Sequence, residues 1–206
     1  MKKIKVGFVI NYRLNKWLGV TFYYKNLFKT ILDQKNSELE LILISDRHIT
    51  TDERKEFEGI KIIQTNLVDR YSRWTKYFNI ILILIFGKNF FFEKFLINNE
   101  IDILSHTNSL GNKSKIPSLK YIPDFQHLHY PEYFTAKLIF LRKLEIWFSS
   151  KHSSKIVLYA RTVLKDLEKI NYSASKKVTF LPYCTNLEND ENLLSMDDLK
   201  KKYNIK

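Results

Sequence analysis

Short apolar runs rich in β-branched residues recur along the chain, separated by polar stretches and by segments with helical periodicity. Such runs are too short for helices and are typical of strands buried in a parallel sheet. Seven of them are predicted strands, at residues 3–11, 39–45, 60–65, 101–106, 119–124, 155–158 and 177–181.

Helical patterns fill several of the gaps between these runs. Apolar residues recur at spacings of three and four in residues 22–31, 136–150 and 162–170. The charged residues 46–58 fit an exposed loop or a short helix. A connection between parallel strands must be long and right-handed, so it carries a helix. The pattern therefore predicts an α/β fold, a Rossmann-like doubly wound parallel sheet.

The most apolar segment lies at residues 70–99. It contains the unbroken run 80–86, and Gly87 indicates a break between two helices. A transmembrane helix needs about 20 mostly apolar residues, and polar residues bracket this run tightly. We expect the run to be buried in the domain.

Composition adds a question about partners. The 206 residues carry a formal charge of +12, and so positive a surface attracts phosphates, nucleic acid or anionic lipid. An AT-rich genome, which favours lysine codons, is an alternative cause of the charge. No nucleic-acid-binding motif occurs, so nucleic acid is not expected. A single cysteine, Cys184, and the lack of a signal-peptide pattern favour the cytoplasm.

Candidate chemistry is expected after the strands, because ligands of doubly wound sheets bind beyond the carboxyl ends of the strands. Three segments qualify, at residues 12–19, 106–111 and 124–129. In the first, Gly19 opens a helix, so a phosphate or a sugar could approach backbone N–H groups. Neither a GxGxxG motif nor a P-loop is present, which argues against nicotinamide and P-loop chemistry.

The densest polar cluster lies at residues 121–134, with Asp124, Gln126, His127 and His129. A carboxylate beside imidazoles can take a proton from an attacking hydroxyl group, as glycosyl transfer requires. Alternatively, the histidines are loop residues bonded to backbone carbonyls. The residues alone leave both interpretations open.

No metal is expected. His127, His129 and Asp124 supply at most three ligands from one loop, and Cys184 is distant in the sequence. A cysteine hydrolase would need a base beside Cys184, and no serine nucleophile elbow occurs.

The segment YIPDFQHLHYPEYF resembles retaining glycosyltransferases of family 4, which have the two-domain GT-B fold. Two further segments agree. After the first strand, the chain resembles a family segment that contains a pair of glycines, and Leu18 stands in place of the first of them. A later segment resembles the family's Lys-x-Asp-Leu helix. The matching residues are Trp17, Gly19, Tyr23, Asn26, Leu27, Lys165, Asp166 and Leu167.

The resemblance implies roles for individual residues. Asp124 would be the acidic residue near the reacting sugar, and Gly19 would contact the donor. The residues implied on the acceptor side are Tyr12, Trp17, His106, Gln126, His127 and His129. The implied substrates are a nucleotide sugar and a glycan or lipid-linked acceptor of surface polysaccharide synthesis, with no cofactor.

The resemblance also implies a division of the chain. Residues 1–186 would form the acceptor-side domain, and residues 187–206 would begin the linker to a donor domain, which a separate chain could supply. Basic aromatic helices would hold the protein peripherally on the anionic inner face of the cell membrane. The alternative is a catalytically silent module that binds a partner or the membrane.

Overall fold

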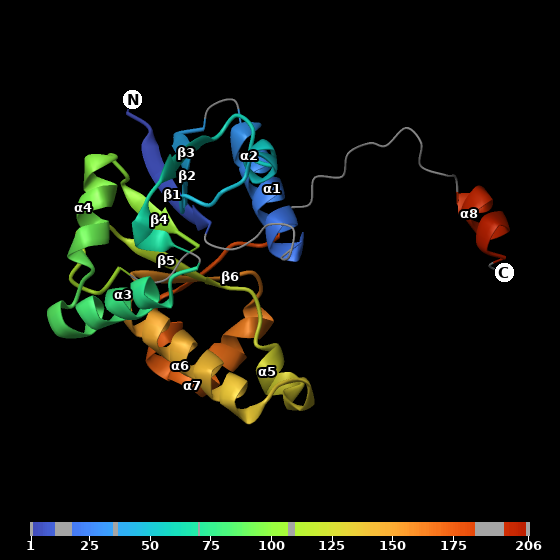
Figure 1. The fold of residues 1–206 in the computed structure, drawn as a ribbon. Helices are drawn as coiled ribbons and strands as arrows, with labels where there is room; N and C mark the ends of the chain where they lie inside the picture. Colours follow the sequence, from blue (N-terminus) through green and yellow to red (C-terminus); the bar gives the residue numbers. More distant parts are fainter. Residues whose placement is uncertain are drawn as a thin grey trace.

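The computed structural model describes residues 2–10, 18–34, 37–69, 71–106, 110–183 and 196–204 (Figure 1). Strands and helices alternate through most of the chain. The strands are β1 (Ile4–Ile10), β2 (Leu39–Ser45), β3 (Lys61–Gln64), β4 (Ile103–Ser105), β5 (Ser118–Ile122), β6 (Lys155–Leu158) and β7 (Val178–Phe180). The helices are α1 (Leu18–Leu32), α2 (Thr51–Lys55), α3 (Arg73–Phe86), α4 (Phe90–Asn98), α5 (Gln126–His129), α6 (Ala136–His152), α7 (Leu164–Ser175) and α8 (Met196–Tyr203).

All seven strands form one parallel sheet in the order β3-β2-β1-β4-β5-β6-β7. The pairing of β1 with β2 is the longest, running from Ile4 opposite Leu39 to Ile10 opposite Ser45. The predicted α/β class and doubly wound sheet are confirmed. The seven predicted strands agree with the observed ones to within a few residues.

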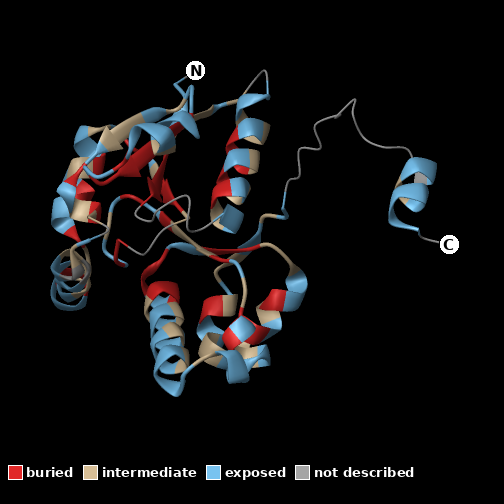
Figure 2. Cartoon of the chain, turned by 45° about the vertical axis from the view of Figure 1, so that its right-hand side comes forward, coloured by how far each residue is buried: buried red, intermediate tan, exposed pale blue. Residues whose placement is uncertain are grey.

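Alternating side chains of β1 and β2 enter two different cores, one on each face of the sheet. Phe8 and Leu43 pack with Phe28 of α1, whereas Val9 and Ile44 point to the other face. There they meet Phe92 and Leu96 of α4. A third core joins β5 and β6 to α7, with a contribution from Ile146 of α6. Figure 2 shows these buried strands between helices whose outer surfaces are exposed.

The predicted break at Gly87 is confirmed. Gly87 caps the carboxyl end of α3 with a φ of 76°, a left-handed conformation that glycine adopts without strain. Gly111 packs against this turn with a φ of 101°. A Cβ atom on Gly111 would lie 2.2 Å from the Gly87 carbonyl oxygen, so the turn between α3 and α4 depends on both glycines.

The expected burial of the apolar run is wrong for much of its length. Leu82 and Ile83 are buried, but Ile81, Leu84, Ile85 and Phe86 are exposed. The run forms the last turns of α3, and a helix that packs by one face only cannot bury every residue of an unbroken apolar run. Among the described residues, no helix is both long and apolar enough to cross a bilayer.

The predicted linker region is described only at α8. This helix is acidic in its first turn and basic in its last, and Figure 1 draws it away from the sheet. The division into a domain at 1–186 and a linker at 187–206 stays a prediction.

Candidate active site at the carboxyl edge of the sheet

The order of the strands reverses between β1 and β4, which lie side by side in the sheet. Chain connections leave such neighbours toward opposite sides, and ligands of doubly wound sheets commonly bind beyond their carboxyl ends. β1 ends at Ile10 and β4 at Ser105. His106, predicted as a site residue, is the first residue after β4 and lies at this position.

His106 is held in an unusual backbone conformation. Its φ is 56°, in the left-handed region that residues other than glycine seldom adopt. Its Nε2 lies 2.7 Å from the Tyr23 hydroxyl and its Nδ1 lies 2.7 Å from the Ser105 hydroxyl. The Tyr24 hydroxyl donates to the His106 carbonyl at 3.3 Å. These contacts from α1 and β4 fix the ring, and such strain is characteristic of functional sites.

Aromatic rings surround this histidine. Tyr23 stacks on Tyr121 of β5 with ring centroids 4.9 Å apart and planes within 9° of parallel. His106 contacts Tyr121 at 4.8 Å, and Tyr183 meets Tyr23 edge-on at 5.4 Å. Tyr159, just after β6, extends the group through Tyr183. We call Tyr23, His106, Tyr121, Tyr159 and Tyr183 the edge cluster.

Burial sets the charge of the edge cluster. It lowers the pKa of His106 to about 3, so the imidazole is neutral at physiological pH. It also raises the pKa of Tyr121, and the nearby hydroxyls of Tyr183 and Tyr23 add to that rise. The cluster is therefore uncharged, and a neutral imidazole of such low pKa positions hydroxyl groups better than it takes protons.

The Tyr121 hydroxyl is buried, and the hydroxyls of Tyr183 and Tyr23 lie close enough to raise its pKa. No hydrogen bond of good geometry joins it to a described residue. A hydroxyl group of a ligand that enters the cluster could bond to it, so the cluster offers polar as well as aromatic contacts.

Asp124 follows the next strand, β5, two residues beyond its last residue, Ile122. One carboxylate oxygen, Oδ1, accepts a hydrogen bond from the Gln126 backbone N–H at 3.2 Å. No partner is recorded for Oδ2 within the described part of the chain. Asp124 is partly exposed, so its second oxygen is available to a substrate hydroxyl.

The other members of the predicted polar cluster lie in different environments. Gln126 is exposed, whereas His127, in the same short helix α5, is only 2% exposed. Neither of its ring nitrogens has a hydrogen-bond partner among the residues that the structure describes. Burial, helped by Arg142 and Lys143, lowers the pKa of His127. His127 therefore stays neutral in the interior, and its contact with an acceptor stays a prediction.

His129 turns outward and binds a carboxylate of α7. Its Nε2 lies 2.7 Å from Asp166 Oδ2, and Lys169 donates to Asp166 Oδ1 at 3.1 Å. Burial alone would raise the pKa of Asp166, but the hydrogen bonds from His129 and Lys169 outweigh it and hold that pKa below its usual value. The pair fixes α5 against α7, the helix that carries Lys165, Asp166 and Leu167.

Gly19 lies in the first turn of α1, which has no acidic residue there. A Cβ atom on Gly19 would meet nothing within 4 Å. Packing in this chain therefore does not require glycine at that position. The open space and the positive end of the helix are suited to an anionic group, and donor contact at Gly19 stays a prediction.

Two predicted site residues, Tyr12 and Trp17, lie outside the described residues, as does Cys184. Within the described part of the chain, no three His, Cys, Asp or Glu side chains form a group that could hold a metal ion.

Sequence reasoning missed the roles of Tyr121, Tyr183 and Asp166. Tyr121 is a polar aromatic residue near the end of a strand, a signal that was available. The pairing of His129 with Asp166 spans 37 residues and had no local signal.

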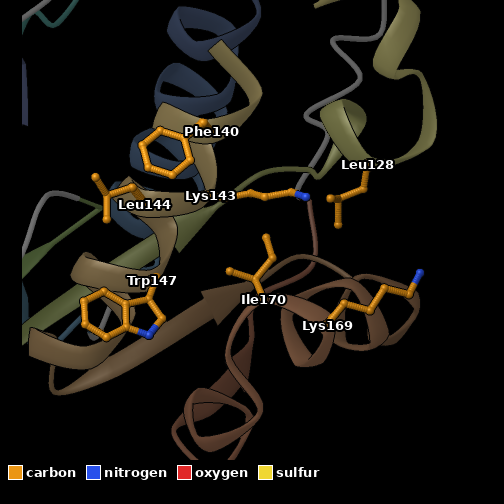
Figure 3. A pocket seen from close by; sticks show the side chains of 7 residues that line it. All are labelled: Leu128, Phe140, Lys143, Leu144, Trp147, Lys169 and Ile170. Atoms are coloured by element: carbon orange, nitrogen blue, oxygen red, sulfur yellow. The ribbon is translucent and has the colours of Figure 1, made fainter. Parts of the chain in front are cut away.

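A groove of about 510 Å³ lies beside α5, between α6 and α7 (Figure 3). Within the predicted segment 124–129, only Leu128 lines it. In Figure 3 the Lys143 side chain reaches across toward Leu128, above Ile170. The other lining residues are Phe140, Leu144, Trp147 and Lys169.

Comparison with solved structures finds a similar fold in a glycosyltransferase from Rickettsia africae ESF-5. The two chains are 16% identical, with a TM-score of 0.50 over 100% of this chain and 51% of that one. The fold is one that a glycosyltransferase uses. This chain spans about half the length of that protein. No protein-family model matches the sequence, and no curated protein matches it.

Proposed function

We propose that this chain is the acceptor-side domain of a retaining glycosyltransferase of family 4 with the GT-B architecture. It would act with a donor domain that holds a nucleotide sugar, in the same protein or in a separate chain. The observation that carries the proposal is the edge cluster around the point where the strand order reverses, with Asp124 just after the neighbouring strand β5. The fold shared with a glycosyltransferase supports it.

The chemistry of the edge cluster suits a sugar. An exposed aromatic face such as that of Tyr183 can pack against the apolar face of a sugar ring. The tyrosine hydroxyls can hydrogen-bond to sugar hydroxyls, and the neutral His106 imidazole positions the Tyr23 hydroxyl among them. The free Oδ2 of Asp124 would orient the attacking hydroxyl group and accept its hydrogen bond. The positive end of α1 at Gly19 would face the donor phosphate.

The acceptor in this proposal is a glycan or a lipid-linked glycan of surface polysaccharide synthesis. The formal charge of +12 supports work at an anionic membrane surface, and the proposed location is the inner face of the cell membrane. Neither a cofactor nor a metal has a role in this proposal.

The proposal is tested with the chain and its donor domain together, by turnover of a panel of nucleotide sugars with extracted lipid-linked glycans, measured as release of nucleoside diphosphate. Asp124→Asn is expected to lower turnover about 100-fold or more, because the amide cannot take a proton. Folding should persist, because an asparagine oxygen can still accept from the Gln126 N–H. Glu38→Gln, an exposed carboxylate just before β2, is the matched control and should keep full turnover.

Equal turnover of Asp124→Asn and the unchanged protein would contradict the assignment of Asp124. A second candidate is the catalytically silent interaction module, favoured by the exposed apolar surface of α3. Turnover by this chain would exclude that candidate. Binding to a partner without any binding of sugars would favour it.

A further inference from the structure

The exposed surface of α3 is apolar, contrary to the usual pattern of a surface helix. Its outward residues recur at spacings of three and four, so they share one face of the helix. We call this set the α3 face: Trp74, Tyr77, Phe78, Ile81, Leu84 and Ile85. Each is about half exposed or more, and Trp74 is 85% exposed. A contiguous apolar surface of this extent marks an interaction site.

The opposite side of α3 is fixed to the domain. Leu82 and Ile83 are buried. Asn79 donates to the Leu67 carbonyl at 3.2 Å and accepts from the Asn89 amide at 2.9 Å. The α3 face therefore cannot be buried by a simple rotation of the helix, because that would expose its anchored side.

The α4 helix widens the surface. Phe91 stacks on Phe78 with ring centroids 5.9 Å apart, and Phe90 meets Phe86 edge-on at 5.6 Å. All four rings are partly exposed, between 37% and 51%. Aromatic side chains at the edge of an apolar surface are typical of contact with a lipid headgroup region.

The charged residues near this surface indicate the kind of partner that it binds. The sequence has no acidic residue from 70 to 92 and includes Arg73 and Lys76 within α3. The acid that follows, Glu93, is buried and paired with Lys88 at 2.7 Å. Lys113 is exposed, and its side chain lies over Gly87 at the end of α3. An apolar face in a basic segment without exposed acids, with Lys113 at the end of its helix, complements an anionic lipid surface.

We infer that the α3 face inserts into the headgroup region of an anionic lipid membrane, with α3 lying in the plane of the interface. The helix has 14 residues, a length suited to lying at the interface and too short to span it. The inference deepens the proposed function by naming the surface that would bring the domain to a lipid-linked acceptor, and in that respect it rests on that function.

The test is sedimentation of the protein with vesicles of phosphatidylglycerol and phosphatidylcholine, compared with vesicles of phosphatidylcholine alone. The unchanged protein is expected to sediment with the anionic vesicles. Trp74→Ser combined with Ile81→Ser and Ile85→Ser should weaken this binding about tenfold or more, because each side chain loses the gain from leaving water. The matched control is Phe140→Ser with Leu144→Ser, which removes exposed apolar groups of similar size from α6.

Three results would overturn the inference. The unchanged protein could fail to bind anionic vesicles, or the α3 and α6 variants could bind equally. Light scattering could instead show a dimer that only the α3 variant converts to monomer, without vesicle binding, which would assign the face to a second copy of the chain. Thermal unfolding checks that both variants fold. Sugar transfer to a detergent-solubilised acceptor is measured separately, so failure of membrane binding and failure of transfer are distinguishable.

Discussion

His106 combines two unfavourable features that the surrounding residues maintain. Its left-handed backbone and its buried neutral ring persist because Tyr23, Tyr24 and Ser105 each bond to it. Such residues cluster where a protein holds a ligand, since the strain is sustained by contacts from several elements.

This burial predicts a loss of stability in acid. Unfolded, His106 takes a proton near its ordinary pKa of about 6.5, whereas its pKa in the folded protein is about 3. Between those values the unfolded state binds more protons, so stability is fully present above about pH 6.5 and falls as the pH is lowered. Burial also lowers the pKa of His127 and His152, which act in the same direction.

Urea unfolding at pH 7, 6 and 5 measures this effect for the unchanged protein and for His106→Gln. The contribution of one such histidine approaches about 1.4 kcal/mol per pH unit. The variant should therefore lose less stability between pH 6.5 and 5 than the unchanged protein. Equal losses would show that His106 titrates normally in the folded protein.

At the scale of the elements, mutation of two glycines distinguishes one that the fold requires, Gly111, from one that a ligand would require, Gly19. Gly111→Ala should cost about 3 kcal/mol of unfolding free energy, because its φ is positive and a Cβ would strike the Gly87 carbonyl. Gly19→Ala should instead stabilise the free protein by up to about 1 kcal/mol, since alanine favours the helix and has room.

Calorimetry with nucleotide sugars then gives the functional part of this comparison. If Gly19 contacts the donor, Gly19→Ala weakens donor binding in spite of its greater stability. Unchanged affinity would remove Gly19 from the site and leave the glycine without a structural reason.

The sequence predicted the elements well because strands and helices leave a periodic signal. The failure at residues 80–86 has a physical reason: a uniformly apolar run shows no face, so it cannot tell which side of α3 packs. Asp124 and His106 do follow strands, as the sequence indicated, whereas their place in a sugar site stays a prediction. The details of this region depended on long-range packing, which turned His127 inward and brought Tyr23 against Tyr121.

At the scale of the whole molecule, the proposed sugar site and the proposed membrane-binding surface lie on different elements. The edge cluster lies where α1, β4 and β5 meet, whereas the α3 face belongs to the segment between β3 and β4. If both proposals hold, separate mutations should remove sugar binding and membrane binding. The chain spans about half of the similar glycosyltransferase, so a donor domain would complete the proposed enzyme.

The most direct measurement is NMR of the five histidine side chains during titration with nucleotide sugars and acceptor glycans. The account predicts saturable shifts of the His106 imidazole. His152, which ends α6 at the opposite edge of the sheet, just before β6 begins, should stay unchanged. Tyr23→Phe should reduce the shift of His106 by weakening binding. If sugars bind and leave the His106 resonances in place, the carboxyl edge of this sheet is not the sugar site.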